Sequence, residues 1–469
     1  MHKLRTVSAG IITLILIATG ISPMFAQSDA ARLQGIITDQ SGALVPGAKV
    51  QVTDASTNRV LETASAPDSG AWSFPVLPPG NYVIQVSMDG FKPIKQNVTL
   101  QIAQVANVNF VLEPGAVSEQ LVVTADAALV DSASSDIGTT VETKQIKDLP
   151  LNGRNFTQLA TLIPGVNRGV PGNVATGQGN NAETFRYGTS GGASLVVNGA
   201  RPQANNFTLD GLDNNESLVN TIVFFPSAEA IQEFKVQTNI APAEFGRAGG
   251  AIVNTTLKSG DNGIHGSAFE FIRNSQVDAR PYFAPNISEF RRNQFGGAIG
   301  APIIKNKLFI FGDYQGFRQS TPVGVDFASV PTALMRQGNF SELLNPSLSG
   351  LSQPYVITNV STGLAYAGNI IPSSLQNPVG LKYLNAYPMP NITGRVQQNY
   401  VIQRQQDQNF DDFDVRSDWN ASQNDRLFAR ASYAHDKEDT STRLPGLPAG
   451  YGSGAAVVFS GRTRAIRWN

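Results

Sequence analysis

The sequence predicts a mainly β protein of several domains, the last of which consists of membrane-spanning β-strands. Apolar and polar residues alternate with a period of two in residues 31–113 and again beyond residue 263, as in strands with two different faces. Turn pairs such as Pro-Gly, Ser-Gly and Asp-Gly separate the runs in residues 31–113. The 44 glycines and the scarcity of long helical periods favour the same class. A length of 469 residues allows two or three domains.

Residues 1–26 have the composition of a signal peptide. Lys3 and Arg5 precede an apolar stretch over residues 9–21, and small residues lead to a cleavage site after Ala26, although Met24 fits that site loosely. A transmembrane anchor is the alternative, but the stretch is shorter than the roughly 20 apolar residues that a spanning helix needs. The chain has no cysteine, which excludes a lipid anchor on cysteine and suits an oxidising compartment such as the periplasm.

The rest of the chain has no other stretch that could cross a membrane as a helix. A membrane location would therefore require β-strands, because only helices and closed barrels satisfy every backbone group in lipid. The net charge is −1 and the lysines and arginines are scattered, so no basic face indicates a nucleic-acid partner.

Residues 31–113 predict a small β-sandwich of about seven antiparallel strands joined by tight turns. Val50 and Val52 point to one side of their strand, and the same alternation recurs in residues 82–88 and 107–112. Trp72 and Phe74 are the aromatic residues that a sugar-binding module would use. Aromatic residues on an alternating strand more often pack inward, so we expect both in the core.

This segment resembles the carboxypeptidase regulatory-like domain along its whole length. The matching motifs are Gly35-Ile36-Ile37-Thr38-Asp39, Pro46-Gly47-Ala48, Pro79-Gly80-Asn81-Tyr82 and Gly90-Phe91. The resemblance implies a fold related to carbohydrate-binding modules and implies no peptidase chemistry.

Residues 117–127 contain one short apolar run between linker residues. Such a run suffices for strand addition, in which an extended segment joins the edge of a partner's sheet through its main chain. The alternatives are an additional strand of the sandwich or an apolar linker.

Residues 128–258 form a separate domain by composition, with dense Asn and Gly between residues 152 and 215. We expect helical structure from about residue 149 to Leu162, strands over residues 194–197, 207–211 and 234–238, and a helix over residues 227–233. The hydrophobic runs are short, so this domain is expected to bury modest apolar area, and its local opening should cost less than the unfolding of a Leu-rich core. Plain loop or disorder is the alternative interpretation of the Asn and Gly density.

The domain resembles the plug of TonB-dependent receptors, and residues 149–156 resemble the Oar-like subgroup of that family. Four motifs occur in the family's order: Val196-Val197-Asn198-Gly199-Ala200-Arg201-Pro202, Thr208-Leu209-Asp210-Gly211, Ala228-Glu229-Ala230-Ile231-Gln232-Glu233-Phe234, and the stretch from Glu244 to Asn254. The motif residues that we carry over are Asn198, Gly199, Arg201, Asp210, Gly211, Gly246, Arg247, Gly249 and Gly250. The resemblance implies an α/β plug.

The same resemblance gives the short apolar run a role as a TonB box, the segment that binds the energy-coupling protein TonB. The residues concerned are Glu119, Gln120, Leu121, Val122, Val123 and Thr124.

Residues 263–469 predict the first strands of a transmembrane β-barrel, about six in number. Phe413, Val415 and Trp419 alternate with charged residues, and segments of about ten residues with one apolar and one charged face are typical of such barrels. Short turns near residues 305–307 and 422–425 contrast with a long excursion from residue 319 to residue 409, as periplasmic turns contrast with extracellular loops. Since TonB-dependent barrels resemble a 22-stranded cylinder, we expect this sequence to be an N-terminal piece.

Nothing in the sequence indicates catalysis, a cofactor or a metal site. The chain has three histidines and no cysteine, and it lacks a nucleophile elbow, a P-loop and a dinucleotide fingerprint. The paired Asp411 and Asp412 stand at the entry of a predicted strand, so we expect both to be solvated.

We therefore expect a TonB-dependent importer in the bacterial outer membrane, with the N-terminal domain in the periplasm. Its partners would be TonB with the inner-membrane energising complex, outer-membrane lipid, and an extracellular ligand that could be an iron chelate, an oligosaccharide or a peptide. The alternatives are a surface adhesin or structural barrel, and a carbohydrate-binding module carried on a barrel.

Overall fold

The computed structural model describes most of the chain. The described residues are 29–115, 121–123, 137–168 and 195–440, with gaps at 216–219, 221, 240–244, 247–248, 281, 283–286 and 288, followed by residue 444 and residues 456–468. The expected signal peptide lies outside them, as do residues 169–194 of the Asn- and Gly-rich stretch. No helix among the described residues is long and apolar enough to cross a bilayer.

The first folded part is a sandwich of two sheets. One sheet contains β4 (Ala71–Leu77), β1 (Ala31–Asp39), β7 (Val105–Asn107) and β8 (Phe110–Leu112). The other has the order β3 (Val60–Ala64), β2 (Lys49–Asp54), β5 (Gly80–Ser87), β6 (Ile94–Leu100) and β9 (Leu121–Val123). The alternation predicted from the sequence is confirmed, because Val50, Val52 and both candidate aromatic residues, Trp72 and Phe74, lie in the core between the sheets.

The sandwich differs from the prediction in its last strands. Eight strands precede residue 113 instead of about seven, and β7 and β8 run parallel to β1. They form one interrupted pairing: Val108 N donates to Gln34 O at 2.8 Å, and Ile36 N donates to Asn109 Oδ1 at 2.9 Å. At this interruption a Cβ on Gly35 would lie 1.8 Å from Val108 O, so only glycine permits the close approach. Alternation alone does not give strand direction.

The second part, here called the middle domain, comprises the described residues of 137–258. Its sheet has the order β10 (Ile137–Glu142), β15 (Ile231–Asn239), β16 (Ile252–Leu257), β13 (Asn206–Leu209) and β14 (Leu212–Asp213), and β11 (Val166–Arg168) pairs with β12 (Leu195–Val197). Helical segments α2 (Thr143–Asp148), η1 (Asn152–Arg154), η2 (Phe156–Leu162) and η5 (Pro202–Ala204) complete it. The helix expected over residues 227–233 is wrong, because a turn occupies residues 228–230 and β15 begins at Ile231.

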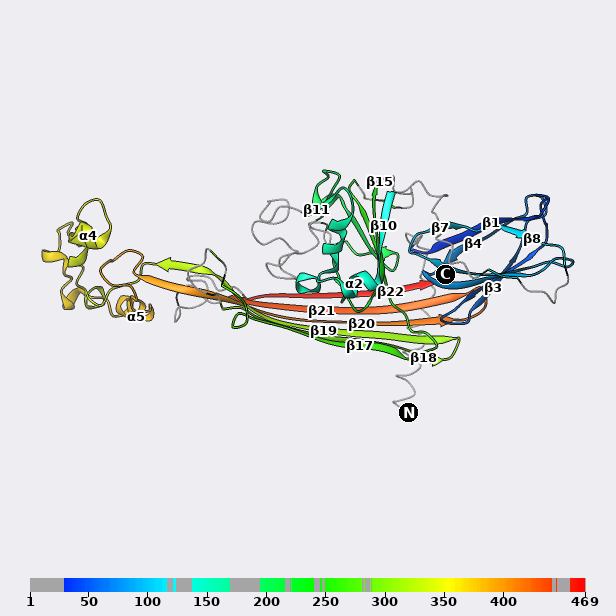
Figure 1. Cartoon of the computed structure of the whole chain (residues 1–469). Helices are drawn as coiled ribbons and strands as arrows, with labels where there is room; N and C mark the ends of the chain where they lie inside the picture. Colours follow the sequence, from blue (N-terminus) through cyan, green and yellow to red (C-terminus); the bar gives the residue numbers. More distant parts are fainter. Residues whose placement is uncertain are drawn as a thin grey trace, which may run out of the picture.

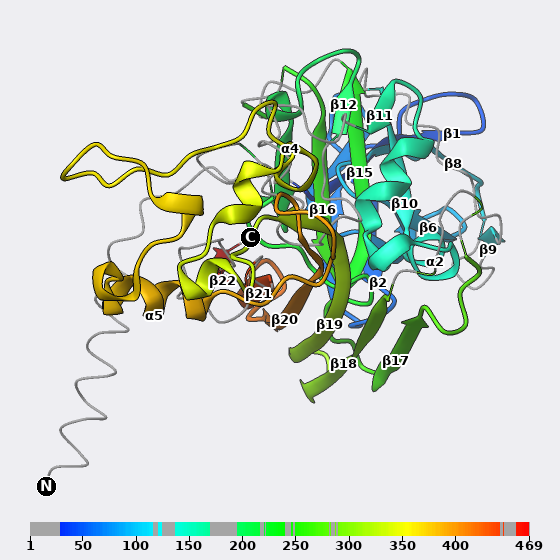
Figure 2. The ribbon, with the colours of Figure 1, turned by 90° about the vertical axis from the view of Figure 1, so that its left-hand side faces the viewer.

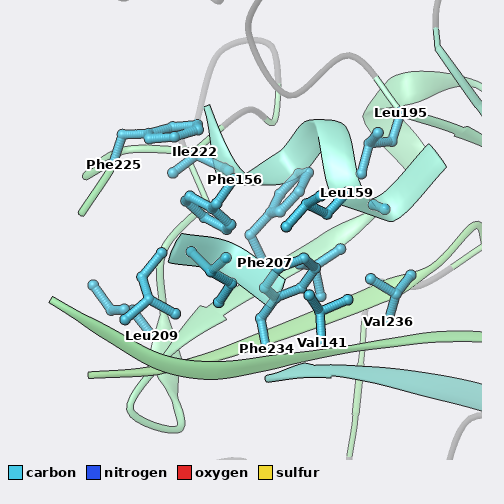
Figure 3. Close-up of a cluster of buried hydrophobic side chains, with 14 of the residues drawn as sticks. Val141, Phe156, Leu159, Leu195, Phe207, Leu209, Ile222, Phe225, Phe234 and Val236 are labelled. Carbon is cyan, nitrogen blue, oxygen red and sulfur yellow. The ribbon is translucent and has the colours of Figure 1, made fainter. Parts of the chain in front are cut away.

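The core of the middle domain lies between η2 and the sheet (Figure 3). Phe156 packs against Phe225 and Phe234, with ring centroids 4.8 and 5.3 Å apart. The cluster also includes Leu159, Phe207 and Val236, and it contains more buried apolar residues than the core of the sandwich. Modest apolar burial was expected, but the described residues bury a cluster at least as large as the sandwich core, because apolar positions scattered along the sequence meet in space.

The third part is a meander of six antiparallel strands. These are β17 (His265–Asn274), β18 (Arg291–Ile304), β19 (Leu308–Ala328), β20 (Tyr400–Asn420), β21 (Arg426–Thr440) and β22 (Ala456–Trp468), each paired with the next. The count of about six is confirmed, and the sheet is open in this structure. The middle domain lies against one face of the sheet, the sandwich lies towards the end with the short turns, and α4 (Pro346–Ser349) and α5 (Pro378–Ala386) lie beyond the opposite end (Figures 1 and 2).

The long connection is shorter and more structured than predicted. Because β19 extends to Ala328 and β20 begins at Tyr400, it covers residues 329–399. Besides α4 and α5 it contains four short 3-10 helices, η6 (Met335–Gln337), η7 (Ser341–Leu344), η8 (Ala367–Asn369) and η9 (Ser373–Leu375). Arg336 ties it together by donating to Leu384 O at 2.7 Å and to Tyr387 O at 3.0 Å.

Candidate functional site

The polarity of the six-stranded sheet is the reverse of that in a water-soluble protein. On the face away from the middle domain, Phe413 and Val415 are each 43% exposed and Trp419 is 50% exposed. The alternating positions of the same strand, Asp414 and Arg416, are buried. Other strands repeat the pattern, with exposed Ile310 and Tyr314 on one face and buried Asp313, Gln315, Arg430 and Ser432 on the other. An apolar outer face and a polar inner face are the arrangement of a barrel in lipid.

The expectation that Asp411 and Asp412 are both solvated is wrong, because one of the two is buried. Asp412 is fully buried on the inner face, whereas Asp411 points to the outer face and is paired with Arg318 at 2.8 Å. Neighbouring residues of a strand point to opposite faces, so these two carboxylates do not form a pair.

Asp210 is the centre of the contact between the middle domain and the sheet. It lies in the turn between β13 and β14 with a φ of 53°, and its side chain is 1% exposed. Leu257 N donates to its Oδ1 at 3.0 Å, and Arg416 Nη1 donates to the same atom at 2.8 Å. Arg430 Nε lies 3.0 Å from its Oδ2. One carboxylate of the middle domain thus joins two strands of the sheet.

The register of the sheet explains why this carboxylate is needed. Arg416 on β20 and Arg430 on β21 are directly opposite each other, and like charges in that position repel. Asp210 lies within ion-pair distance of both arginines, while Asp418 lies 2.9 Å from Arg416 and Asp414 lies 3.7 Å from Arg430. Asp418 also pairs with Arg426 at 2.9 Å, so three aspartates balance three arginines. Buried charges are stable only in such a paired arrangement.

A second contact forms where η1 meets the sheet. Arg154 forms an ion pair with Glu229, and its guanidinium lies over the rings of Phe269 and Phe271 of β17, 5.2 and 4.6 Å from their centroids. Burial lowers the pKa of Arg154, and the neighbouring Glu229 opposes this shift. Close to this ion pair, Ser227 Oγ donates to Asp313 Oδ2 at 2.7 Å. These contacts between the two bodies are polar and charged, whereas Phe311 of β19 joins the apolar core cluster of the middle domain.

The predicted motif residues do not converge on one pocket. Asn198 and Gly199 form a turn in which Asn198 Nδ2 donates to Thr238 O at 2.6 Å, near one end of β15. Asp210, which Gly211 follows in the same turn, accepts a hydrogen bond from Leu257 N, and Leu257 pairs with the opposite end of β15. The remaining motif residues lie in other places. Arg201 is exposed before η5 and Gly246 follows Phe245, whereas Gly249 and Gly250 both donate through N–H to Ala204 O at 3.0 Å. Arg247 lies outside the described residues.

The segment predicted to bind TonB lies on the sandwich. Leu121–Val123 forms β9, which pairs in parallel with β6 in the register Ile94 with Leu121, Lys95 with Val122 and Gln96 with Val123. This is the added sandwich strand that the sequence left as an alternative. Glu119, Gln120 and Thr124 lie outside the described residues.

A polar contact joins the sandwich to the middle domain. The loop that follows β6 reaches the polar side of β15: Ile102 N donates to Glu233 Oε1, and Lys235 Nζ donates to Ala103 O at 3.1 Å. Burial raises the pKa of Glu233 to about 7, and the nearby Glu142 adds to this shift, whereas the hydrogen bond from Ile102 opposes it.

Replacing Glu233 with Gln is expected to remove a pH dependence from the stability of the middle domain. The folded pKa of about 7 exceeds the ordinary 4.5, so the folded protein binds more protons between these values, and stability falls as the pH rises through this window. Above pH 7 the charged carboxylate costs about 3 kcal/mol, which the amide avoids.

The free energy of unfolding in urea, measured at pH 5 and pH 8, tests this effect. The readout is hydrogen exchange of the amides that pair β10 with β15. Glu62→Gln is the matched control, because that carboxylate is on the sandwich surface, paired with Lys49 at 2.9 Å. The control should keep the wild-type pH dependence. A Glu233→Gln variant that also keeps it would show that this carboxylate is not the titrating group.

The described residues contain no group of three or more His, Cys, Asp or Glu side chains that could hold a metal ion. At the contact of the two bodies, the ion pairs Arg154–Glu229, Arg416–Asp210 and Arg430–Asp210 each join an acidic to a basic residue.

Two family models match the chain. The model described as "Outer membrane beta barrel domain" matches residues 256–468, and the "Carboxypeptidase regulatory-like domain" matches residues 32–113. The TonB-dependent transporter Oar of Myxococcus xanthus is 27% identical over 321 residues, which cover 64% of this chain and 28% of that protein. The chain thus spans less than a third of the length of this relative.

Solved structures give weaker similarities. The outer membrane transporter YddB from Escherichia coli has a TM-score of 0.42 at 12% identity, covering 71% of this chain and 36% of that chain. The siderophore receptor PirA from Acinetobacter baumannii has a TM-score of 0.33 at 15% identity, covering 71% and 44%.

Proposed function

We propose that the protein imports a substrate across the bacterial outer membrane with energy delivered by TonB. Two findings support this proposal: the chain is a homologue of the TonB-dependent transporter Oar, and it carries an outer-membrane β-barrel domain, which indicates that membrane as its location. In this proposal the sandwich is periplasmic, residues 117–127 contain the TonB-contacting segment, residues 128–258 are the plug, and residues 263–469 belong to the barrel wall. No catalytic step is assigned to any of them.

The reversed polarity of the six-stranded sheet is the observation that carries this proposal. Lipid can cover the exposed face that includes Phe413, Val415 and Trp419, and the buried face is polar where it meets the middle domain. A polar inner face suits either water or a polar body. The middle domain provides one, with Asp210 and Arg154 at the contact.

The polar character of this contact supports a movable plug. An apolar interface would resist separation in water, whereas water can hydrate the groups of the Asp210 and Arg154 networks once they part. Traction on the segment at Leu121–Val123 would reach the middle domain through β10, the edge strand of its sheet. The proposed partners are therefore TonB with its energising complex and an extracellular ligand, namely an iron chelate, an oligosaccharide or a peptide.

Uptake measurements test the proposal against a surface adhesin. A strain that lacks the protein is compared with its parent on a panel of labelled iron chelates, oligosaccharides and peptides. We expect the parent to accumulate at least one of them and accumulation to fall to the level of the deletion strain when a protonophore collapses the proton-motive force. Accumulation that survives the protonophore, or a deletion that alters surface attachment but no uptake, would overturn the proposal.

A further inference from the structure

The β6 edge of the sandwich holds the segment that is proposed to bind TonB. Leu121–Val123 is extended and adds a last strand, β9, to the sheet beside β6. The pairing covers three residues and is parallel, so few main-chain hydrogen bonds hold it, and parallel pairs are slightly the weaker kind. Such a short strand can be exchanged between two partners.

The sandwich that holds β9 is itself fixed at the barrel. Its turn between β2 and β3 contacts both short turns of the six-stranded sheet: Asn58 Nδ2 donates to Asn306 Oδ1 at 3.1 Å, and Arg59 Nη2 donates to Gln423 O at 3.1 Å. The loop directly after β6 contacts Glu233 and Lys235 of the middle domain. The strand edge that binds β9 is thus held in a defined position beside the barrel.

Strand addition by TonB would use the N–H and C=O groups of the same segment, Leu121–Val123. A strand presents its N–H and C=O groups alternately to its two sides, so a segment paired with β6 has only part of them left for another strand. A three-residue strand then offers very little to a second partner on its outer side. Full pairing with TonB requires that the segment first leave the sandwich.

We propose that the β6 edge is the resting dock of Leu121–Val123 and that TonB obtains this segment by strand exchange, taking it from the sandwich. This inference rests on the proposed function, because it concerns the same TonB-contacting segment. The sandwich is then a restraint that keeps the segment away from TonB until the pairing with β6 opens.

Disulfide cross-linking in the membrane-embedded protein tests the dock. The chain has no cysteine, so an engineered pair is the sole source of a disulfide within it. Lys95→Cys with Val122→Cys joins two register partners. The matched control is Thr99→Cys with Val122→Cys, which places the first cysteine four residues farther along β6, roughly 13 Å away and beyond the reach of a disulfide. We expect the first pair to oxidise and the control pair to stay reduced.

Capture of the purified C-terminal domain of TonB then tests the exchange. The oxidised Lys95–Val122 pair is expected to capture it at least about tenfold less than the same protein after reduction, because the lock removes the binding-competent state. Equal capture by the oxidised and reduced forms would overturn the exchange, and oxidation no faster than the control would overturn the dock. If neither the wild type nor the reduced variant captures TonB, the proposed function fails in its TonB contact, whereas cross-linking still decides the dock.

Discussion

Replacing Asp210 with Asn is expected to weaken the attachment of the middle domain to the barrel sheet by about 3 kcal/mol, because removal of one partner leaves buried charges uncompensated. Asn keeps the size of the side chain and can still accept from Leu257 N. It loses the negative charge that lies between Arg416 and Arg430, which face each other across two strands. Asp414 still pairs with Arg430, and Asp418 is shared between Arg416 and Arg426, so one positive charge is left unbalanced and we place the cost at the low end for a broken buried network.

Hydrogen exchange measures this loss at β13 and β16, the strands next to Asp210. A loss of this size raises exchange by about 100-fold if the strands open together with the attachment. Asp278→Asn makes the same chemical change in the exposed pair with Arg273 and should alter exchange little, since exposed pairs contribute about 0–1 kcal/mol. We also expect Asp210→Asn cells to admit large antibiotics such as vancomycin. If the Asp210→Asn variant shows hydrogen exchange at the wild-type rate and its cells still exclude vancomycin, the Asp210 network does not hold the middle domain.

The sequence predicted the strands well where each strand has two different environments. Phe413, Val415 and Trp419 lie on the exposed face and Asp414 on the buried face, as the alternation required. The same rule failed at the far ends of β19 and β20. Residues 403–408 are polar at every position, so no periodicity marks them, although they belong to the pairing that continues to Tyr400 with Ala328.

Local propensity misled the prediction for residues 227–233. Alternating Ala and Glu favour a helix when taken alone. In the fold, Ile231–Asn239 pairs with β10 on one side and with β16 on the other, and this pairing outweighs a preference of a few tenths of a kcal/mol per residue. Such pairings join residues distant in sequence and cannot be read from one window of the chain.

The motifs indicated important residues without revealing their partners. The sequence motif indicated Asp210, and Arg416 and Arg430 are charged residues in two strands whose apolar and polar residues alternate. Their convergence depends on the register of β20 against β21 and on the placement of the turn at Asp210, neither of which follows from spacing in the sequence. A charged residue on the inner face of a predicted barrel strand is the signal that could have led to this site.

Replacing Leu121 with Pro is expected to abolish uptake while substrate binding stays at the wild-type level. Proline has no N–H, so it removes a donor from the short segment that must pair with a strand of TonB, and its fixed φ disfavours extension of the pairing. The substrate is the one identified in the uptake panel. The segment lies on the last strand of the sandwich sheet, away from the core of the middle domain, so the surface that meets the substrate should keep its structure.

The comparison with Leu121→Ala separates the main chain from the side chain. Alanine keeps the N–H and loses only apolar contacts, so we expect uptake to fall a few-fold at most, as main-chain pairing gives most of the affinity in strand addition. Val123→Pro should behave as Leu121→Pro does, because residues two apart direct their N–H groups to the same side of a strand. Wild-type uptake by both proline variants would mean that TonB acts on another part of the chain. Uptake lost equally in the alanine variant would mean that TonB recognises the leucine side chain and not the extended main chain.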